Sequence, residues 1–209
     1  MQPSTCASHN AVNNPDARNP RGLAATGVGT FDCIRHDMKR PCAVGDLQKG
    51  ERCVKGFPLR QIVHIQTVPT SYINMDYLFF STLQLTLVLM IVVSYDVVCQ
   101  WYKKLWHRMK TFPHTWHVDH KGHTSVTFLV PKFHLPAHIE FCHNNFSFNL
   151  TKGVGRTDGE GVERGWEHIN PLASSTKEMG PGSRQDTLDD HFGDRNWKKT
   201  VGLVEHSCV

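Results

Sequence analysis

The chain has 209 residues and a mass of 23.7 kDa, which fits one ordinary domain or one domain with a tail. Hydrophobic residues at 39% and charged residues at 20% exclude a disordered acidic chain, a collagen and a heptad rod. The formal net charge of +4 permits a polyanionic partner without requiring one.

The first third of the chain is predicted to be largely irregular. Residues 1–30 contain repeated Pro and Gly and are expected to form an irregular arm without the apolar core of a signal peptide. Residues 31–53 predict two short extended pieces around a turn at Pro41. Residues 73–84 predict a short helix with Asn74 as its N-cap.

An apolar stretch over residues 78–93 has about the length that a bilayer requires, so a membrane-anchored protein is one alternative. Polar residues such as Gln84 interrupt the stretch, and its second half is rich in β-branched residues. These features favour a helix that ends near Gln84, followed by a buried strand over residues 87–98. We therefore expect no membrane partner.

The later elements alternate between helix and strand. A basic helix is predicted over residues 100–110 and a strand over 125–131. Residues 134–143 fit a helix, and further helices are predicted over 160–169 and 187–204. Two strands separated by helices, followed by a late helix that carries acids, predict an α/β fold.

Asp96 directly follows the predicted buried strand. In open α/β sheets this end of a strand borders the ligand crevice. An unpaired buried carboxylate is costly, so Asp96 needs a metal, a basic partner or a water channel. The residues alone support another interpretation almost equally well, in which Asp96 is the N-cap of a helix beginning near residue 98.

A second acidic group consists of Glu160, Glu163 and Glu167, whose spacing places them on one helix face. Together with Asp96 they would make an oxygen-rich site for Mg²⁺ or Mn²⁺, of the kind used in phosphoryl transfer. An acidic helix start that is favoured by the helix dipole is the simpler explanation of these residues by themselves.

Cysteine and histidine also occur at chelating spacings. The seven Cys are an odd number and follow no signal peptide, so reduced thiols or metal ligands are more plausible than disulfides. The pairs Cys6-x-x-His9 and Cys33-x-x-His36 suit a tetrahedral structural Zn²⁺. The alternative is two unrelated buried thiols.

A third group recurs every four residues, at His134, His138 and Cys142. On a helix these side chains would share one face. They would either complete a second zinc site or pack behind the strand that ends at Asp96.

The predicted helix over residues 100–110 carries basic side chains between aromatic ones. Its basic edge could follow DNA phosphates while the aromatic side chains pack inward. An ordinary amphipathic helix with a solvated face is the favoured alternative. The candidate DNA contacts are Lys103, Lys104, Arg108 and Lys110.

Several blocks of the sequence resemble the Kyakuja-Dileera-Zisupton (KDZ) transposases, in particular the fungal members. The resemblance spans nearly the whole chain and implies an RNase H-like mixed sheet with flanking helices and a DDE-type acidic triad. It also implies a nuclear enzyme that cuts and rejoins transposon-end DNA with two divalent metals. The blocks are GDLQKGER (45–52), NMDY (74–77), SYDVVCQWY (94–102), KFHLPAH (132–138), KGVGRTDGEGVERGW (152–166) and the segment 170–199.

By this resemblance, Asp96 matches the second acid of the triad, and either Glu160 or Glu163 matches the last. Glu163 is preferred because it lies one turn before Trp166. The first acid of the family normally lies in a stretch like LDANFRL, which this sequence lacks. We therefore expect a fragment without the first strand and without full activity, since two acids should not hold the two-metal geometry.

The resemblance also suggests how the chain is divided. Residues 1–36 form the Cys/His arm and residues 37–204 the partial transposase core, with 54–72 as an insertion foreign to the family. We hypothesise that this insertion is a retained intron. The alternative function is a non-catalytic DNA- or zinc-binding transposon remnant, and either form could be a homo-oligomer.

Overall fold

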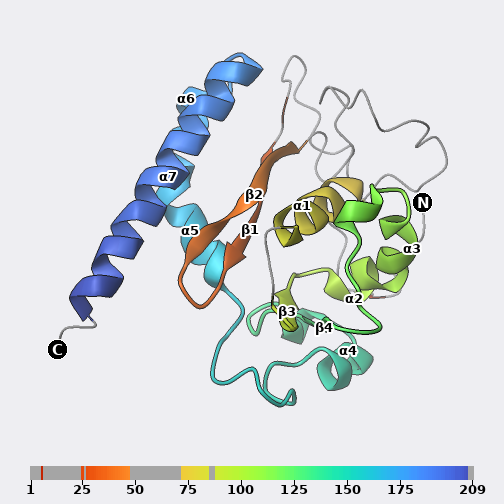
Figure 1. The fold of residues 1–209 in the computed structure, drawn as a ribbon. Coiled ribbons are helices and arrows are strands. Elements are labelled where there is room, and N and C mark those ends of the chain that lie inside the picture. The colour runs from red at the N-terminus through yellow and green to blue at the C-terminus, as the bar shows by residue number, and fades with distance from the viewer. Residues whose placement is uncertain (1–5, 7–24, 26, 48–71, 85–87, 207–209) are drawn as a thin grey trace.

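The computed structural model describes residues 6, 25, 27–47, 72–84 and 88–206 (Figure 1). Its first regular unit is an antiparallel hairpin of β1 (Gly27–Cys33) and β2 (Met38–Leu47). The turn of this hairpin contains Asp37, whose φ of 52° lies in the left-handed region that Asp tolerates better than most residues.

The turn predicted at Pro41 is wrong, because Pro41 lies inside β2. The pairing register with β1 shifts between Thr30 and Asp32, opposite the segment that contains Pro41. Proline has no backbone N–H to donate to a ladder, so an irregular position of this kind is where a strand accommodates it.

Helix α1 (Ile73–Leu83) forms close to the predicted helical range 73–84, and it packs against the hairpin. Its N-cap is Tyr72 without a side-chain cap, and Asn74 lies inside the helix. The contact with the hairpin is close. A Cβ at Gly29 would come within 3.0 Å of Leu78 Cδ1, so the absence of a side chain there allows helix and sheet to meet.

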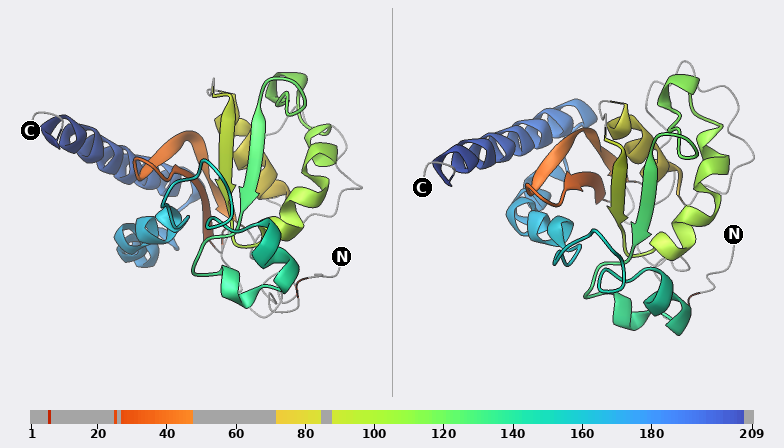
Figure 2. Two further views of the ribbon diagram at one scale, coloured as in Figure 1. Left: turned by 90° about the horizontal axis from the view of Figure 1, so that it is seen from below. Right: turned by 60° about the horizontal axis from the view of Figure 1, so that its bottom comes forward.

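A parallel pair of strands forms the second sheet. β3 (Met90–Ser94) pairs in register with β4 (Ser125–Leu129), and Figure 2 shows the two strands side by side. The crossover between them replaces the single helix predicted over residues 100–110 with short pieces. These are α2 (Val98–Trp101), η1 (Tyr102–Lys104), α3 (Leu105–Met109) and η2 (His114–Trp116).

The rest of the described chain consists of helices and loops, and α7 is its longest element. Figure 1 shows α7 running beside the hairpin, where it begins earlier than the predicted residue 187. Pro181 opens it, in keeping with the preference of proline for a first helical turn. The elements are η3 (Leu135–Ala137), α4 (Glu140–Asn145), α5 (Gly161–Ile169), η4 (Asn170–Leu172), α6 (Ala173–Thr176) and α7 (Pro181–His206).

The main core is built around the buried indole of Trp101. Its ring makes edge contacts with Phe79 of α1, Tyr95 and Phe128 of β4, at centroid distances of 5.2, 5.9 and 5.9 Å. Aromatic pairs in this edge-to-face arrangement add to the stabilisation from burial alone. The core thus ties α1 to the parallel strand pair.

The described residues form a mixed α/β fold with two two-stranded sheets, which confirms the predicted class in this coarser form. No helix in the described ranges is both long and apolar enough to cross a membrane. The apolar stretch over 78–93 is divided instead between α1 and β3, with 85–87 outside the described residues.

Candidate metal and carboxylate sites

Two carboxylates meet beside one imidazole at the end of the parallel strand pair. Asp96 follows β3 and His134 follows β4, so the parallel arrangement brings them to the same edge. His134 Nε2 lies 3.7 Å from Asp96 Oδ1 and 3.9 Å from Glu160 Oε2. All three side chains retain some solvent exposure, so a small ligand could reach them.

The loop before α5 holds Glu160 in this place through backbone contacts with both strand ends. The Phe133 N–H donates to Glu160 Oε1 at 2.8 Å, and the Lys132 N–H donates to the Asp158 carbonyl at 2.8 Å. From the other strand, Ser94 Oγ donates to the Gly159 carbonyl at 3.0 Å. The position of Glu160 is therefore set by main-chain bonds as well as by its own side chain.

Asp158 stabilises the same loop. Its Oδ2 accepts a hydrogen bond from Arg164 Nη1 at 2.8 Å, and its Oδ1 accepts one from the Glu160 N–H at 3.0 Å. These two bonds, the Arg164 bond first, hold the pKa of Asp158 below its usual value. Asp158 is therefore a structural carboxylate that orients the start of α5.

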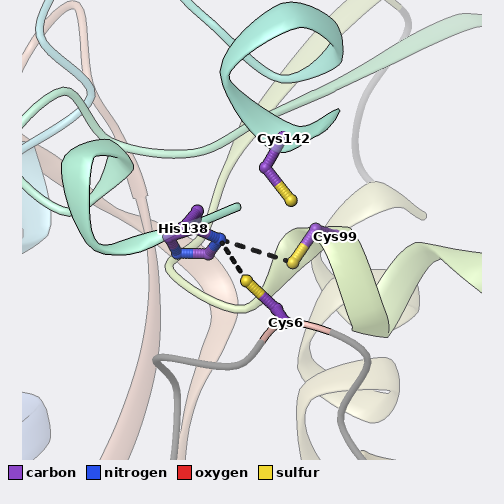
Figure 3. A group of neighbouring side chains, drawn as sticks. All are labelled: Cys6, Cys99, His138 and Cys142. Atoms are coloured by element: carbon purple, nitrogen blue, oxygen red, sulfur yellow. Dashed lines mark hydrogen bonds between the residues drawn. The ribbon is translucent and has the colours of Figure 1, made fainter. Parts of the chain in front are cut away.

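A second cluster lies in the protein core, behind α2 and α4. Cys6, Cys99, His138 and Cys142 are all buried, and their ligand atoms lie within 4.8 Å of one another (Figure 3). His138 Nδ1 is 3.3 Å from Cys6 Sγ and 3.6 Å from Cys99 Sγ. Such a Cys₃His cluster could hold a metal such as zinc.

The environment of the cluster affects its thiols. Burial, together with the neighbouring Cys99 and Cys6, raises the pKa of the Cys142 thiol to about 12. Burial also raises the pKa of Cys99. In the metal-free protein these two groups are therefore neutral thiols near pH 7, and a metal ion must displace their protons when it binds.

Comparison with known families identifies the chain. Residues 1–68 and 62–196 match the family described as Kyakuja-Dileera-Zisupton transposase. The chain belongs to this family. No curated protein and no solved structure matches it.

The structure of this KDZ chain excludes one alternative role of Asp96 and shows where Glu160 and Glu163 lie. Asp96 is not the cap of the following helix, because the N-cap of α2 is Val97 and no side chain caps it. Glu160 lies at the strand edge with Asp96. Glu163 lies on α5, but its side chain is outside the described part of the chain, and Glu167 on the same helix is exposed.

The Cys and His residues of the KDZ chain are grouped differently from the two predicted pairs. Cys33 Sγ and His36 Nδ1 lie 3.2 Å apart at the hairpin turn, outside the buried cluster that contains Cys6. His9 is outside the described residues. His134 belongs to the carboxylate edge.

His138 and Cys142 do come together, although no single helix spans residues 134–143. His138 has an extended backbone between η3 and α4, with ψ at 165°. The cluster also includes Cys99, which no sequence pattern singled out. A lone Cys at the start of a crossover has no chelating neighbour in sequence, so its spacing gave no signal.

The basic residues of the crossover separate into two groups. Lys103, Lys104 and Lys110 are exposed. Arg108 is buried and forms an ion pair with Asp76, so it belongs to the core and not to an exposed basic edge. This corrects the sequence prediction for Arg108. Its long apolar stem and planar head suit such a buried pair.

Proposed function

We propose that this chain is the partial core of a DDE-type DNA transposase with an RNase H-like arrangement, in which Asp96 and Glu160 bind a divalent cation. Membership in the KDZ family supports a transposase. The observation that carries the assignment of residues is the approach of both carboxylates to His134 at one end of a parallel strand pair.

The donor set at this edge fits the proposed cation. Asp96 and Glu160 supply carboxylate oxygens, which are the ligands that Mg²⁺ and Mn²⁺ prefer. When bound, such an ion would activate the attacking oxygen and stabilise the leaving oxygen of a DNA strand. Asp96 would hold it from the turn that follows β3, and Glu160 from the loop before α5.

His134 would keep the two acids in place at this edge. It lies between them and can fix their separation through contacts with both. Because the sequence lacks the stretch that matches the first acid of the family, we infer that cleavage by this chain is weak or absent. Binding of one cation is then the most direct property of the site.

Substitution of the two acids tests this proposal. Asp96→Asn and Glu160→Gln should each lower Mn²⁺ affinity by at least about tenfold, because each removes a charged ligand oxygen while keeping the side-chain shape. Mn²⁺ binding can be followed by electron paramagnetic resonance of the free ion. Nicking of transposon-end DNA in Mg²⁺, if it is detectable, should decline in parallel.

Glu167→Gln is the matched control, since Glu167 is exposed on α5. Its Mn²⁺ affinity should equal that of the unsubstituted chain. Glu163→Gln distinguishes the two candidates for the last acid. If Glu163→Gln lowers Mn²⁺ affinity and Glu160→Gln leaves it unchanged, the role of last acid belongs to Glu163. Unchanged affinity in Asp96→Asn would contradict the proposed site.

The exposed lysines of the crossover are proposed to contact DNA phosphates. Alanine at Lys103, Lys104 and Lys110 should reduce the slope of log affinity against log salt by about 0.9 for each phosphate that is no longer neutralised. Fluorescence anisotropy with labelled duplex DNA over a salt series measures this slope. Lys177→Ala, in an exposed ion pair with Glu178, should leave it unchanged. If Lys177→Ala reduced the slope as much as alanine at one of the crossover lysines, the result would argue against a defined DNA surface.

A second candidate is a non-catalytic remnant that binds DNA or zinc. The buried Cys₃His cluster favours it, because a structural metal would persist without any cleavage activity. In both cases the proposed partner is transposon-end DNA, with nuclear localisation and a homo-oligomer as further parts of the proposal. Binding of DNA or zinc by a chain whose Mn²⁺ affinity is unchanged in both Asp96→Asn and Glu160→Gln would favour the remnant.

A further inference from the structure

The buried Cys₃His cluster brings together three parts of the chain that are distant in sequence, around Cys6, around Cys99 and around residues 138–142. Cys99 comes from α2, His138 from the turn after η3 and Cys142 from α4, while Cys6 reaches them from the N-terminal region (Figure 3). Each of the four is among the most buried side chains of its segment. Convergence of three thiols and one imidazole from separate segments is not explained by any local chain geometry.

The separations of the ligand atoms match those of a tetrahedral zinc site. With Zn–S bonds of about 2.3 Å and Zn–N bonds of about 2.0 Å, the ligand atoms lie about 3.5–3.8 Å apart. The observed Sγ–Nδ1 distances of 3.3 and 3.6 Å are close to this range. The remaining separations stay within 4.8 Å, so small side-chain shifts would complete the geometry.

We propose that Cys6, Cys99, His138 and Cys142 bind one structural Zn²⁺ ion that fastens residue 6 to the core beside α2 and α4. Three thiolates and one imidazole fill all four positions of the ion, which is typical of structural and not catalytic zinc. Nε2 of Gln100 donates toward Cys99 Sγ at 3.6 Å, a contact that partly offsets the negative charge of the thiolates.

The position of the ion would also affect the carboxylate edge. Cys99 lies in α2, just after Asp96. His138 follows the short helix η3, which begins just after His134. Backbone bonds make both segments compact, from the Val98 N–H to the Tyr95 carbonyl at 3.0 Å and from the His138 N–H to the Leu135 carbonyl at 3.0 Å. Zinc would hold these two segments together and so position Asp96 and His134. This coupling rests on the proposed function, whereas zinc binding itself does not.

Metal content of the purified full chain tests the site directly. After reconstitution with Zn²⁺ and removal of excess ion, mass spectrometry should find about one zinc per chain. Cobalt substituted for zinc should give the sulfur-to-metal charge-transfer and intense visible bands of a tetrahedral thiolate site. Absence of zinc from the reduced, folded chain, or an octahedral cobalt spectrum, would overturn the proposal.

Variants locate the ion. Cys99→Ser and Cys142→Ser should each retain less than about a tenth of the zinc, because each removes one of four ligands. Cys42→Ser, at an exposed thiol outside the cluster, should retain all of it. Cys33→Ser should also retain it. Loss of zinc in Cys33→Ser with retention in Cys142→Ser would place the ion at the hairpin turn and refute the buried site.

A measurement on the unsubstituted chain guards against variants that fail to fold. Because the metal binds the folded site far more tightly than the unfolded chain, the zinc-loaded protein should unfold at a higher urea concentration than the same protein stripped by a chelator. Equal unfolding midpoints with and without zinc would overturn the proposal. These outcomes are independent of Mn²⁺ binding at Asp96, so failure of the carboxylate proposal leaves the zinc result interpretable.

Discussion

Asp76→Ala should lower the free energy of unfolding by about 3–5 kcal/mol, because it leaves a buried guanidinium without its counter-charge. Arg108 Nε and Nη2 both donate to the Asp76 carboxylate, the latter at 2.9 Å. Trp101 Nε1 donates to the same group at 2.7 Å. The substitution therefore removes the acceptor of three hydrogen bonds at the centre of the core. Urea denaturation followed by tryptophan fluorescence measures the loss.

Asp194→Ala is the matched control, since Asp194 pairs with Lys198 one turn along α7 and both side chains are largely exposed. Its cost should be at most about 0.5 kcal/mol. A double substitution, Asp76→Leu with Arg108→Met, should recover part of the loss, because apolar side chains can replace a buried pair. Equal losses for Asp76→Ala and Asp194→Ala would refute the role assigned to the buried pair.

Gly159→Ala is expected to destabilise the chain by about 2–5 kcal/mol through two effects that act together. Gly159 has φ of 81°, a conformation that costs a residue with a Cβ about 1–2 kcal/mol. Its Cβ would also lie 2.5 Å from Ser94 Oγ and 2.6 Å from Phe148 Cε2, and such overpacking costs about 1–3 kcal/mol.

Gly153→Ala separates the two effects. Gly153 has nearly the same φ, 84°, but a Cβ there would meet no atom within 4 Å. It should therefore show the backbone cost alone, measured in the same denaturation assay. Because Gly159 precedes Glu160, its variant should also weaken Mn²⁺ binding, whereas the Gly153 variant should not. Equal stability losses would show that the contact with Ser94 and Phe148 is not close in solution.

The sequence predicted the elements whose signal is local. Helix α1, strand β4 and helix α5 appear near their expected positions, because their apolar spacing or flanking residues are diagnostic by themselves. Pro41 misled the hairpin prediction, since a proline that marks a turn in one context fills an irregular strand position in another. The predicted helix 100–110 breaks into short pieces that follow the packing of Trp101, which no local pattern reveals.

The candidate sites show the same contrast between residues with a local sequence signal and residues that only the packing brings together. Asp96 could be found because it follows an apolar strand, and Glu160 because it opens a helix after a Gly-rich loop. The Cys₃His cluster was found in part, since His138 and Cys142 are neighbours in sequence. Their association with Cys6 and Cys99 depends on how the strands and the crossover pack, and chelating spacing such as Cys6-x-x-His9 carries no information about such distant partners.

The separation of the cluster residues along the chain has a consequence for biosynthesis. Cys6 leaves the ribosome before Cys142, which emerges only after α1, both parallel strands and the crossover between them. A nascent chain therefore exposes the uncoordinated Cys6 thiol until Cys142 has also been made. We expect newly made protein to depend on reducing conditions during this interval. Premature oxidation of Cys6 would remove one proposed zinc ligand before Cys142, the last ligand, has been made.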